Sequence, residues 1–206
     1  MTKMLRSFVK PIHTRSAAAL ILAASFVALP GCTSTQLQGQ SSSYLIVQSI
    51  SAARGDTPDE DFPVLDSDVS TNGTIFADIA NINLTLGMKD PGSTQNPSTP
   101  TSANYITVTR YHVKYIRSDG RNVQGVDVPY EFDAGSTATV VGTGTEMTIT
   151  LVRVQAKLEA PLKSLVGQGG QVAITTTAEI TLYGKDQAGR DVSVKGTITV
   201  NFADFG

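Results

Sequence analysis

The chain has 206 residues, of which 16 are Lys or Arg and 18 are Asp or Glu, so that its formal net charge is −2. It contains one cysteine and no tryptophan. A single cysteine excludes a disulfide within the chain. The scattered, slightly negative charge argues against nucleic acid as a partner, because nucleic-acid binding needs clustered Lys and Arg.

The first 31 residues have the composition of an export signal. Residues 1–15 carry two lysines and two arginines without any acid, and residues 17–29 are almost entirely apolar. A bilayer span needs about 20 apolar residues, so this apolar run is too short to remain in the membrane as a helix. We therefore expect residues 1–31 to be a cleaved signal peptide.

The apolar run ends in Leu29-Pro30-Gly31-Cys32, which contains the one cysteine of the chain. This segment resembles the lipobox of bacterial lipoproteins, although Pro30 stands where that pattern usually has Ala, Ser, Thr or Val. The resemblance implies cleavage before Cys32, a diacylglycerol thioether on its sulfur and acylation of its amino group. Thr33 replaces the Asp that retains enterobacterial lipoproteins in the inner membrane, which implies the outer membrane where the organism has one. The alternative is an ordinary secretory signal that leaves Cys32 as a free thiol.

Removal of the signal changes the charge and defines the domain organisation. Four of the 16 basic residues and none of the 18 acidic residues would be lost, leaving 12 against 18 and a formal charge of −6. A surface of this charge cannot hold anionic lipid electrostatically, so attachment to the membrane would depend on the acyl chains of Cys32. Residues 32–43 are small and polar and predict a flexible tether. Residues 44–206 predict a single domain.

From Tyr44 onward the pattern is that of β-strands. Residues 172–182 and 192–202 alternate apolar and polar side chains with period two and flank a turn at 184–190, which predicts a β-hairpin with one face in a core. Further strands are predicted at 44–53, 75–88, 105–117, 126–132 and 147–158, with a short one near 138–141. Changes of parity within 75–88 and 147–158 predict bulges or a strand that passes between sheets. Residues 160–166 predict one helical turn with Pro161 at its first position.

Seven or eight strands without a long helix predict an all-β fold, an antiparallel β-sandwich. Strand number and spacing resemble immunoglobulin-like or fibronectin-like domains. The Cys…Trp…Cys signature of antibody domains is absent, since the chain has no tryptophan. A closed β-barrel is the alternative architecture.

An acidic stretch between the first two predicted strands is a candidate calcium site. Calcium takes six to eight oxygen ligands, which several carboxylates and loop carbonyls could supply. The spacing is not that of an EF-hand, and a solvated acidic loop is the simpler interpretation. The candidate ligands are Asp56, Asp59, Asp61, Asp66 and Asp68.

Two other segments are candidates for recognition. Residues 89–104 contain three prolines and no large apolar side chain, which favours disorder over a partner-binding tip. Residues 105–130 combine tyrosines with arginines, a pairing typical of recognition surfaces and of carbohydrate stacking. The candidate binding residues there are Tyr111, Tyr115, Arg117 and Arg121, although tyrosines in sandwich strands also lie at the edge of the core.

Catalytic machinery is scarce in the sequence. Once the signal with His13 is removed, His112 is the one histidine left, so a multi-histidine zinc site cannot form within the chain. No Gly-x-Ser-x-Gly motif presents a nucleophile, and no cofactor motif is found. We therefore expect a non-catalytic, lipid-anchored envelope protein that binds or scaffolds envelope proteins or polysaccharide. A carbohydrate- or calcium-binding module is the first alternative, and an envelope hydrolase the second.

Overall fold

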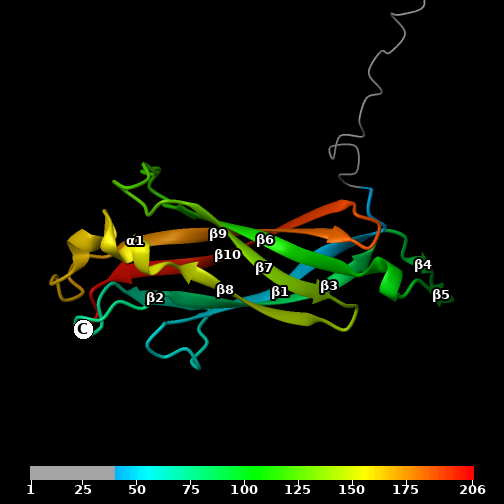
Figure 1. The fold of residues 1–206 in the computed structure, drawn as a ribbon, viewed down its shortest axis with the longest axis horizontal. Coiled ribbons are helices and arrows are strands. Elements are labelled where there is room, and N and C mark those ends of the chain that lie inside the picture. Colours follow the sequence, from blue (N-terminus) through cyan, green and yellow to red (C-terminus); the bar gives the residue numbers. More distant parts are fainter. Residues whose placement is uncertain (1–39) are drawn as a thin grey trace, which may run out of the picture. The chain divides into compact units, whose positions relative to one another are not determined.

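A computed structural model describes residues 40–206 as two β-sheets packed face to face (Figure 1). One sheet has the strand order β1-β3-β8, formed by Ser43–Ala53, Asp78–Met88 and Thr145–Val152. The other has the order β2-β10-β9-β6-β7, formed by Val64–Asp68, Asp191–Ala203, Ile174–Asp186, Ile106–Ile116 and Phe132–Val140. The predicted all-β sandwich is confirmed, and its strand order is immunoglobulin-like. The predicted signal peptide, Cys32 and residues 33–39 of the predicted tether lie outside the described residues.

The core forms because alternate side chains of both sheets point between them. In β3 the buried set is Ala80, Ile82, Leu84 and Leu86, and the residues between them are only partly covered. The predicted hairpin is confirmed as β9 and β10, which pair without a break from Asp191↔Lys185 to Phe202↔Ile174. One hydrophobic cluster joins the two sheets.

One strand of the five-stranded sheet is absent from the sequence prediction. β2 was expected to belong to a mobile acidic loop, but it pairs with β10 over Thr199–Ala203, and the pairing is parallel. Its first four residues alternate exposed and buried positions, with Leu65 and Ser67 facing inward, and Asp68 is also buried. The sequence did not predict this strand because it contains Asp66 and Asp68, and acidic residues are depleted in strands.

Three predicted strands have different bounds. β8 ends at Val152, and the chain then forms the short helix α1 (Val154–Leu158), so the predicted strand at 147–158 is wrong in its second half. β3 begins at Asp78 and keeps one parity; the irregular register lies between Asp78 and Ile79, where β3 meets β8. The predicted strand at 126–132 is a loop, since the Gly125 and Asp127 amides donate to the carbonyls of Val128 and Val123, and β7 starts only at Phe132.

The segment 89–104 is folded, contrary to the prediction of disorder. It contains the two-residue strands β4 (Gly92–Ser93) and β5 (Asn96–Pro97) and the 3-10 turn η2 (Ser102–Asn104). Asn104 fixes the end of the segment, because its side-chain amide donates to Ser42 Oγ at 2.9 Å and its carbonyl accepts from Ser43 Oγ at 2.7 Å. The predicted helical turn after Ala160 is present as the 3-10 helix η3 (Leu162–Leu165).

The described chain starts and finishes at opposite ends of the sandwich (Figure 1). Gln40 precedes β1 at the end where the β9–β10 turn and the β4–β5 hairpin lie. Gly206 follows β10 at the end that carries α1 and the β6–β7 loop. We refer to these as the Gln40 end and the Gly206 end.

Candidate functional site

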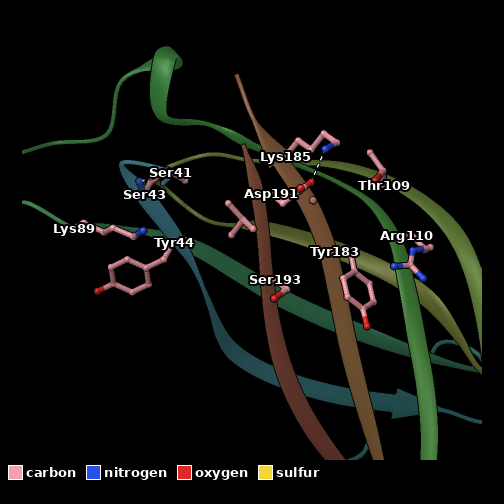
Figure 2. A pocket seen from close by; sticks show the side chains of 12 residues that line it. Ser41, Ser43, Tyr44, Lys89, Thr109, Arg110, Tyr183, Lys185, Asp191 and Ser193 are labelled. Atoms are coloured by element: carbon pink, nitrogen blue, oxygen red, sulfur yellow. Dashed lines mark hydrogen bonds and ion pairs between the residues drawn. The ribbon is translucent and has the colours of Figure 1, made fainter. Parts of the chain in front are cut away.

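A half-open groove of about 680 Å³ lies at the Gln40 end, and we call it the Gln40 groove. Its volume falls within the range of small ligand pockets. Figure 2 shows Tyr44 and Tyr183 on opposite sides of β10. The lining comes from β1, β6, β9 and β10 and from residues just before β1 and just after β3. It includes Tyr44, Arg110, Tyr183, Lys185, Asp191 and Ser193.

The two tyrosine rings of the groove are held by their neighbours. Tyr44 lies opposite Gly87 in the β1–β3 ladder, and a Cβ at Gly87 would come within 2.3 Å of the Tyr44 ring. The Tyr44 ring therefore occupies the space that a side chain at position 87 would fill. Across β10, the guanidinium of Arg110 stacks 4.1 Å from the centre of the Tyr183 ring, a cation–π contact.

The charges of the groove are largely paired. Arg110 Nη1 contacts Asp133 Oδ1 at 2.6 Å, and Lys185 Nζ contacts the Asp191 carboxylate. Lys89 also lines the groove, which gives three cationic side chains against one carboxylate in the lining. Most of the residues that line the groove are thus polar or charged.

The start of the described chain is fastened beside this groove. Arg190 Nη1 donates to the carbonyl of Gln40 at 2.8 Å, and Ser41 is buried and hydrogen-bonds Asp186. Burial would raise the pKa of Asp186, but hydrogen bonds from the Arg190 and Ala188 amides and from Ser41 outweigh it and lower the pKa. The β9–β10 turn therefore fixes where the chain leaves the sandwich.

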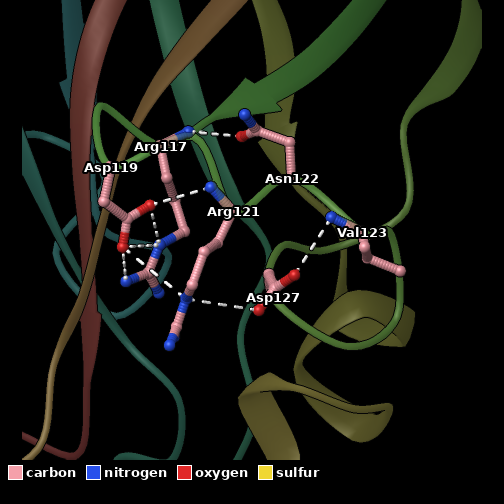
Figure 3. Close-up of polar contacts among 6 residues, drawn as sticks. All are labelled: Arg117, Asp119, Arg121, Asn122, Val123 and Asp127. Atoms are coloured by element: carbon pink, nitrogen blue, oxygen red, sulfur yellow. Dashed lines mark hydrogen bonds and ion pairs between the residues drawn. The ribbon is translucent and has the colours of Figure 1, made fainter.

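Two predicted binding residues, Arg117 and Arg121, belong to the β6–β7 loop, which lies at the Gly206 end (Figure 1), and Figure 3 shows their contacts. Arg117 Nη2 contacts Asp119 Oδ2 at 2.6 Å, and Arg121 Nε lies 3.5 Å from Asp127 Oδ1. The hydrogen bond from Arg117 lowers the pKa of Asp119 to about 2, and the same bond raises the pKa of Arg117. These arginines organise their own loop.

The other two predicted binding residues, Tyr111 and Tyr115, are core residues. They are 4% and 2% exposed, so neither ring can stack on a carbohydrate. The Tyr115 hydroxyl donates to the carbonyl of Leu151 at 2.6 Å, and the Tyr111 hydroxyl accepts from the Thr150 amide at 3.2 Å. Burial raises the pKa of Tyr115 far above its usual range, and Asp78 adds to this effect.

The predicted calcium ligands are not brought together. Asp56 faces Arg54, Asp61 accepts from Asn81, Asp66 accepts from Asn201, and Asp68 accepts from the amides of Ser70 and Phe205. Asp59 is exposed in the loop. Within residues 40–206, no three His, Cys, Asp or Glu side chains are placed to hold a metal ion.

His112 lies on β6 between two carboxylates. Its Nδ1 is 3.4 Å from Asp133 Oδ2, and its Nε2 is 3.7 Å from Glu131 Oε2. Asp133 is shared with Arg110, so the imidazole belongs to a surface charge network. This arrangement offers an acid partner for a histidine, but among the described contacts no hydroxyl nucleophile is bonded to the ring.

The sequence did not reveal a buried ion pair between Lys157 of α1 and Asp78 of β3. Lys157 Nζ lies 2.8 Å from Asp78 Oδ2, and each side chain is 1% exposed. Asp78 also accepts from the Gly55 amide at 3.0 Å and from Ser67 Oγ at 2.6 Å, while Lys157 donates to the Asp68 carbonyl at 2.7 Å. The pair therefore joins β2, β3 and α1. In the strand predicted at 147–158, Lys157 occupies a polar position between apolar residues, and such a position is expected to face solvent.

The comparisons with known proteins add no family or relative. No protein-family model matches the chain, and no curated protein matches it either. Among the described residues, no helix is both long enough and apolar enough to cross a membrane.

Proposed function

We propose that the protein is a lipid-anchored lipoprotein of the bacterial cell envelope whose β-sandwich is a non-catalytic binding or scaffolding module. The observation that carries this proposal is Leu29-Pro30-Gly31-Cys32, which places the one cysteine of the chain directly after a basic and then apolar segment. Thr33 favours the outer membrane as the destination. The partners we infer are the bilayer, through the acyl chains of Cys32, and an envelope protein or polysaccharide.

The distance from Cys32 to the sandwich supports a location close to the bilayer. Gln40 is eight residues after Cys32 and is fastened to the β9–β10 turn. Eight extended residues span at most about 28 Å, and a flexible linker of this length averages about 16 Å between its ends. An acylated Cys32 would therefore keep the Gln40 groove near the lipid surface and raise its effective concentration toward other anchored components.

The anchor is tested by replacing its sulfur. Cys32→Ala should abolish incorporation of radiolabelled palmitate and move the protein from the membrane fraction to the soluble fraction. Thr33→Ala is the matched control, because it leaves the sulfur in place and should remain labelled. A wild-type chain that takes up no palmitate, or a Cys32→Ala variant that stays in the membrane, would refute the anchor.

A hydrolase is the competing class, and His112 is the residue through which a Ser–His–Asp mechanism would have to act. We expect His112 to have no role beyond the charge network with Asp133 and Glu131. Fractions that contain the wild type and His112→Ala should be equally inert toward fluorogenic ester and glycoside substrates. Turnover by the wild type that the substitution removes, without loss of the folded state, would support the hydrolase.

A further inference from the structure

We propose that the Gln40 groove binds an extended polypeptide segment, which adds as a short strand to the open edge of β10. The open edge is the part of β10 from Asp191 to Ile198. Within residues 40–206 it pairs with β9 on one side, whereas β2 reaches only Thr199–Ala203 on the other. This inference rests on the proposed function and names its partner class. A protein segment is favoured over polysaccharide.

The hydrogen-bonding pattern shows which backbone groups the open edge offers. The Asp186 amide donates to the Arg190 carbonyl at 3.0 Å, so this is a bonded pair of the β9–β10 ladder. Bonded and non-bonded pairs alternate along antiparallel strands, so Val192 and Val194 bond to β9. Ser193 and Lys195 consequently direct their N–H and C=O groups away from β9. The other end of β10 follows the same alternation. There the carbonyl of Ala203, also an odd-numbered residue, points away from β9 and accepts from the Val69 amide beside β2 at 2.9 Å.

β1 presents a second free edge on the other side of the groove. The Lys89 amide donates to the Ser42 carbonyl at 3.0 Å, and the same alternation turns Leu45 and Val47 of β1 away from β3. Residues Ser43 and Tyr44 of β1 and Asp191 and Ser193 of β10 line the same groove. The edges of β1 and β10 therefore both border the groove, which β6 and β9 line beyond β10, and backbone N–H and C=O groups are the ligands that an extended peptide satisfies best.

The groove also limits the length of its occupant. At Gly196 the two strands approach so closely that a Cβ would lie 2.5 Å from Ile50 Cδ1. Side chains of β1 thus close the groove there and leave it open toward Gln40. From Asp191 to Lys195 the edge is about 13 Å long at roughly 3.3 Å per residue, which fits a strand of four or five residues.

The charged side chains on the open edge do not cover it. Charged residues on edge strands usually protect against pairing with other chains. Here Lys195 Nζ binds Glu179 Oε1 at 2.8 Å and Asp191 binds Lys185, so both side chains are drawn over β9 and away from the edge.

The test uses a heptapeptide library displayed on phage and panned against the full chain in detergent. Enriched peptides should bind the wild type and Ser193→Ala equally, because the contact is made by the backbone. They should bind Ser193→Pro at least tenfold less, since proline removes the N–H that faces the groove. Lys195→Pro provides a second variant in case the first does not fold, and circular dichroism establishes the folded state of each; proline is tolerated on sheet edges.

The bound register is read by amide hydrogen exchange. Binding should slow exchange at Ser193 and Lys195 and leave Thr177, which lies on the interior strand β9, unchanged.

Absence of enriched peptides, or peptides that bind both folded proline variants as well as the wild type, would overturn the proposal. Displacement by a synthetic peptide of residues 33–39 would assign the groove to the chain's own linker, and concentration-dependent dimers lost in Ser193→Pro would assign it to a second copy; either result also overturns it. Palmitate labelling of the same preparations is scored separately, so a failed anchor is not confused with a failed groove.

Discussion

The two ends of the sandwich are closed in different ways. At the Gly206 end, a buried lysine and aspartate join α1, β2 and β3, and every polar group of that pair has a partner. At the Gln40 end, β2 no longer pairs with β10, and a groove lies at the start of β10 with β1 on one side and β9 and β6 on the other. At the Gly206 end the polar groups thus bond within the chain. At the Gln40 end, backbone N–H and C=O groups of β10 face away from β9. We expect stability to depend mainly on the Gly206 end and recognition mainly on the Gln40 end.

The largest effect should come from breaking the buried ion pair. Lys157→Met leaves Asp78 buried without its cation and should lower the free energy of unfolding by about 3–5 kcal/mol, as measured by urea denaturation. Lys163→Met, on the exposed side of η3, is the control and should cost less than about 0.5 kcal/mol. A Lys157→Met loss as small as that of the control would mean that the pair does not hold this end together.

Replacing both partners separates the cost of an unpaired charge from that of lost packing. The double variant Lys157→Met with Asp78→Leu should recover at least half of the stability lost in Lys157→Met, because no charge is left buried alone. If the double variant is less stable than Lys157→Met, the hydrogen bonds from Gly55 and Ser67 to Asp78 matter more than the charge.

A smaller loss is expected from Tyr115→Phe. The change removes the hydroxyl that donates to the buried Leu151 carbonyl and should cost about 1–3 kcal/mol. Tyr44→Phe, whose ring is exposed at the Gln40 end, should be nearly neutral. Equal losses in the two variants would contradict the contrast between the ends.

At the Gln40 end, Arg190→Ala should change the global stability by less than about 1 kcal/mol, since its side chain is partly exposed. It should nevertheless speed amide hydrogen exchange at residues 41–43, because the Gln40 carbonyl loses its donor. Arg121→Ala, at the opposite end, should leave exchange at residues 41–43 unchanged. Exchange that is equally fast in both variants would show that the β9–β10 turn does not fix the start of the domain.

The smallest effect concerns pH and the β6–β7 loop. The pKa of Asp119 falls from 3.8 to about 2 in the folded chain, so its ion pair with Arg117 contributes to stability above the unfolded pKa and is lost as the pH falls through the folded value. Urea denaturation of the wild type should show a decline between about pH 4 and pH 2 that is shallower in Asp119→Asn. Identical pH profiles would show that the loop pair adds nothing to folding.

The strands could be predicted where one face is buried and the other is solvated. β9 and β10 alternate apolar and polar side chains without interruption, and their hairpin was predicted correctly. The prediction failed where the local pattern was ambiguous. Val126 and Val128 look like a strand but lie in a loop closed by its own hydrogen bonds, and β2 carries two acids that disguise a strand.

The candidate site was predicted less well than the fold. Tyr111 and Tyr115 have the residue type of a recognition surface, but their register on β6 turns both rings into the core. Tyr44 and Tyr183, which do line a groove, come from strands about 140 residues apart in the chain. Nothing local in either strand indicates that they meet.

The sequence by itself determined the all-β class, the alternation that forms the core and the candidate anchor at Cys32. Each of these depends on residues that are close together along the chain. The tertiary structure decided the buried pair of Lys157 and Asp78 and the groove that β1, β6, β9 and β10 line. Both depend on which strand edges meet, and that is fixed by the packing of two whole sheets, a property that no short segment carries.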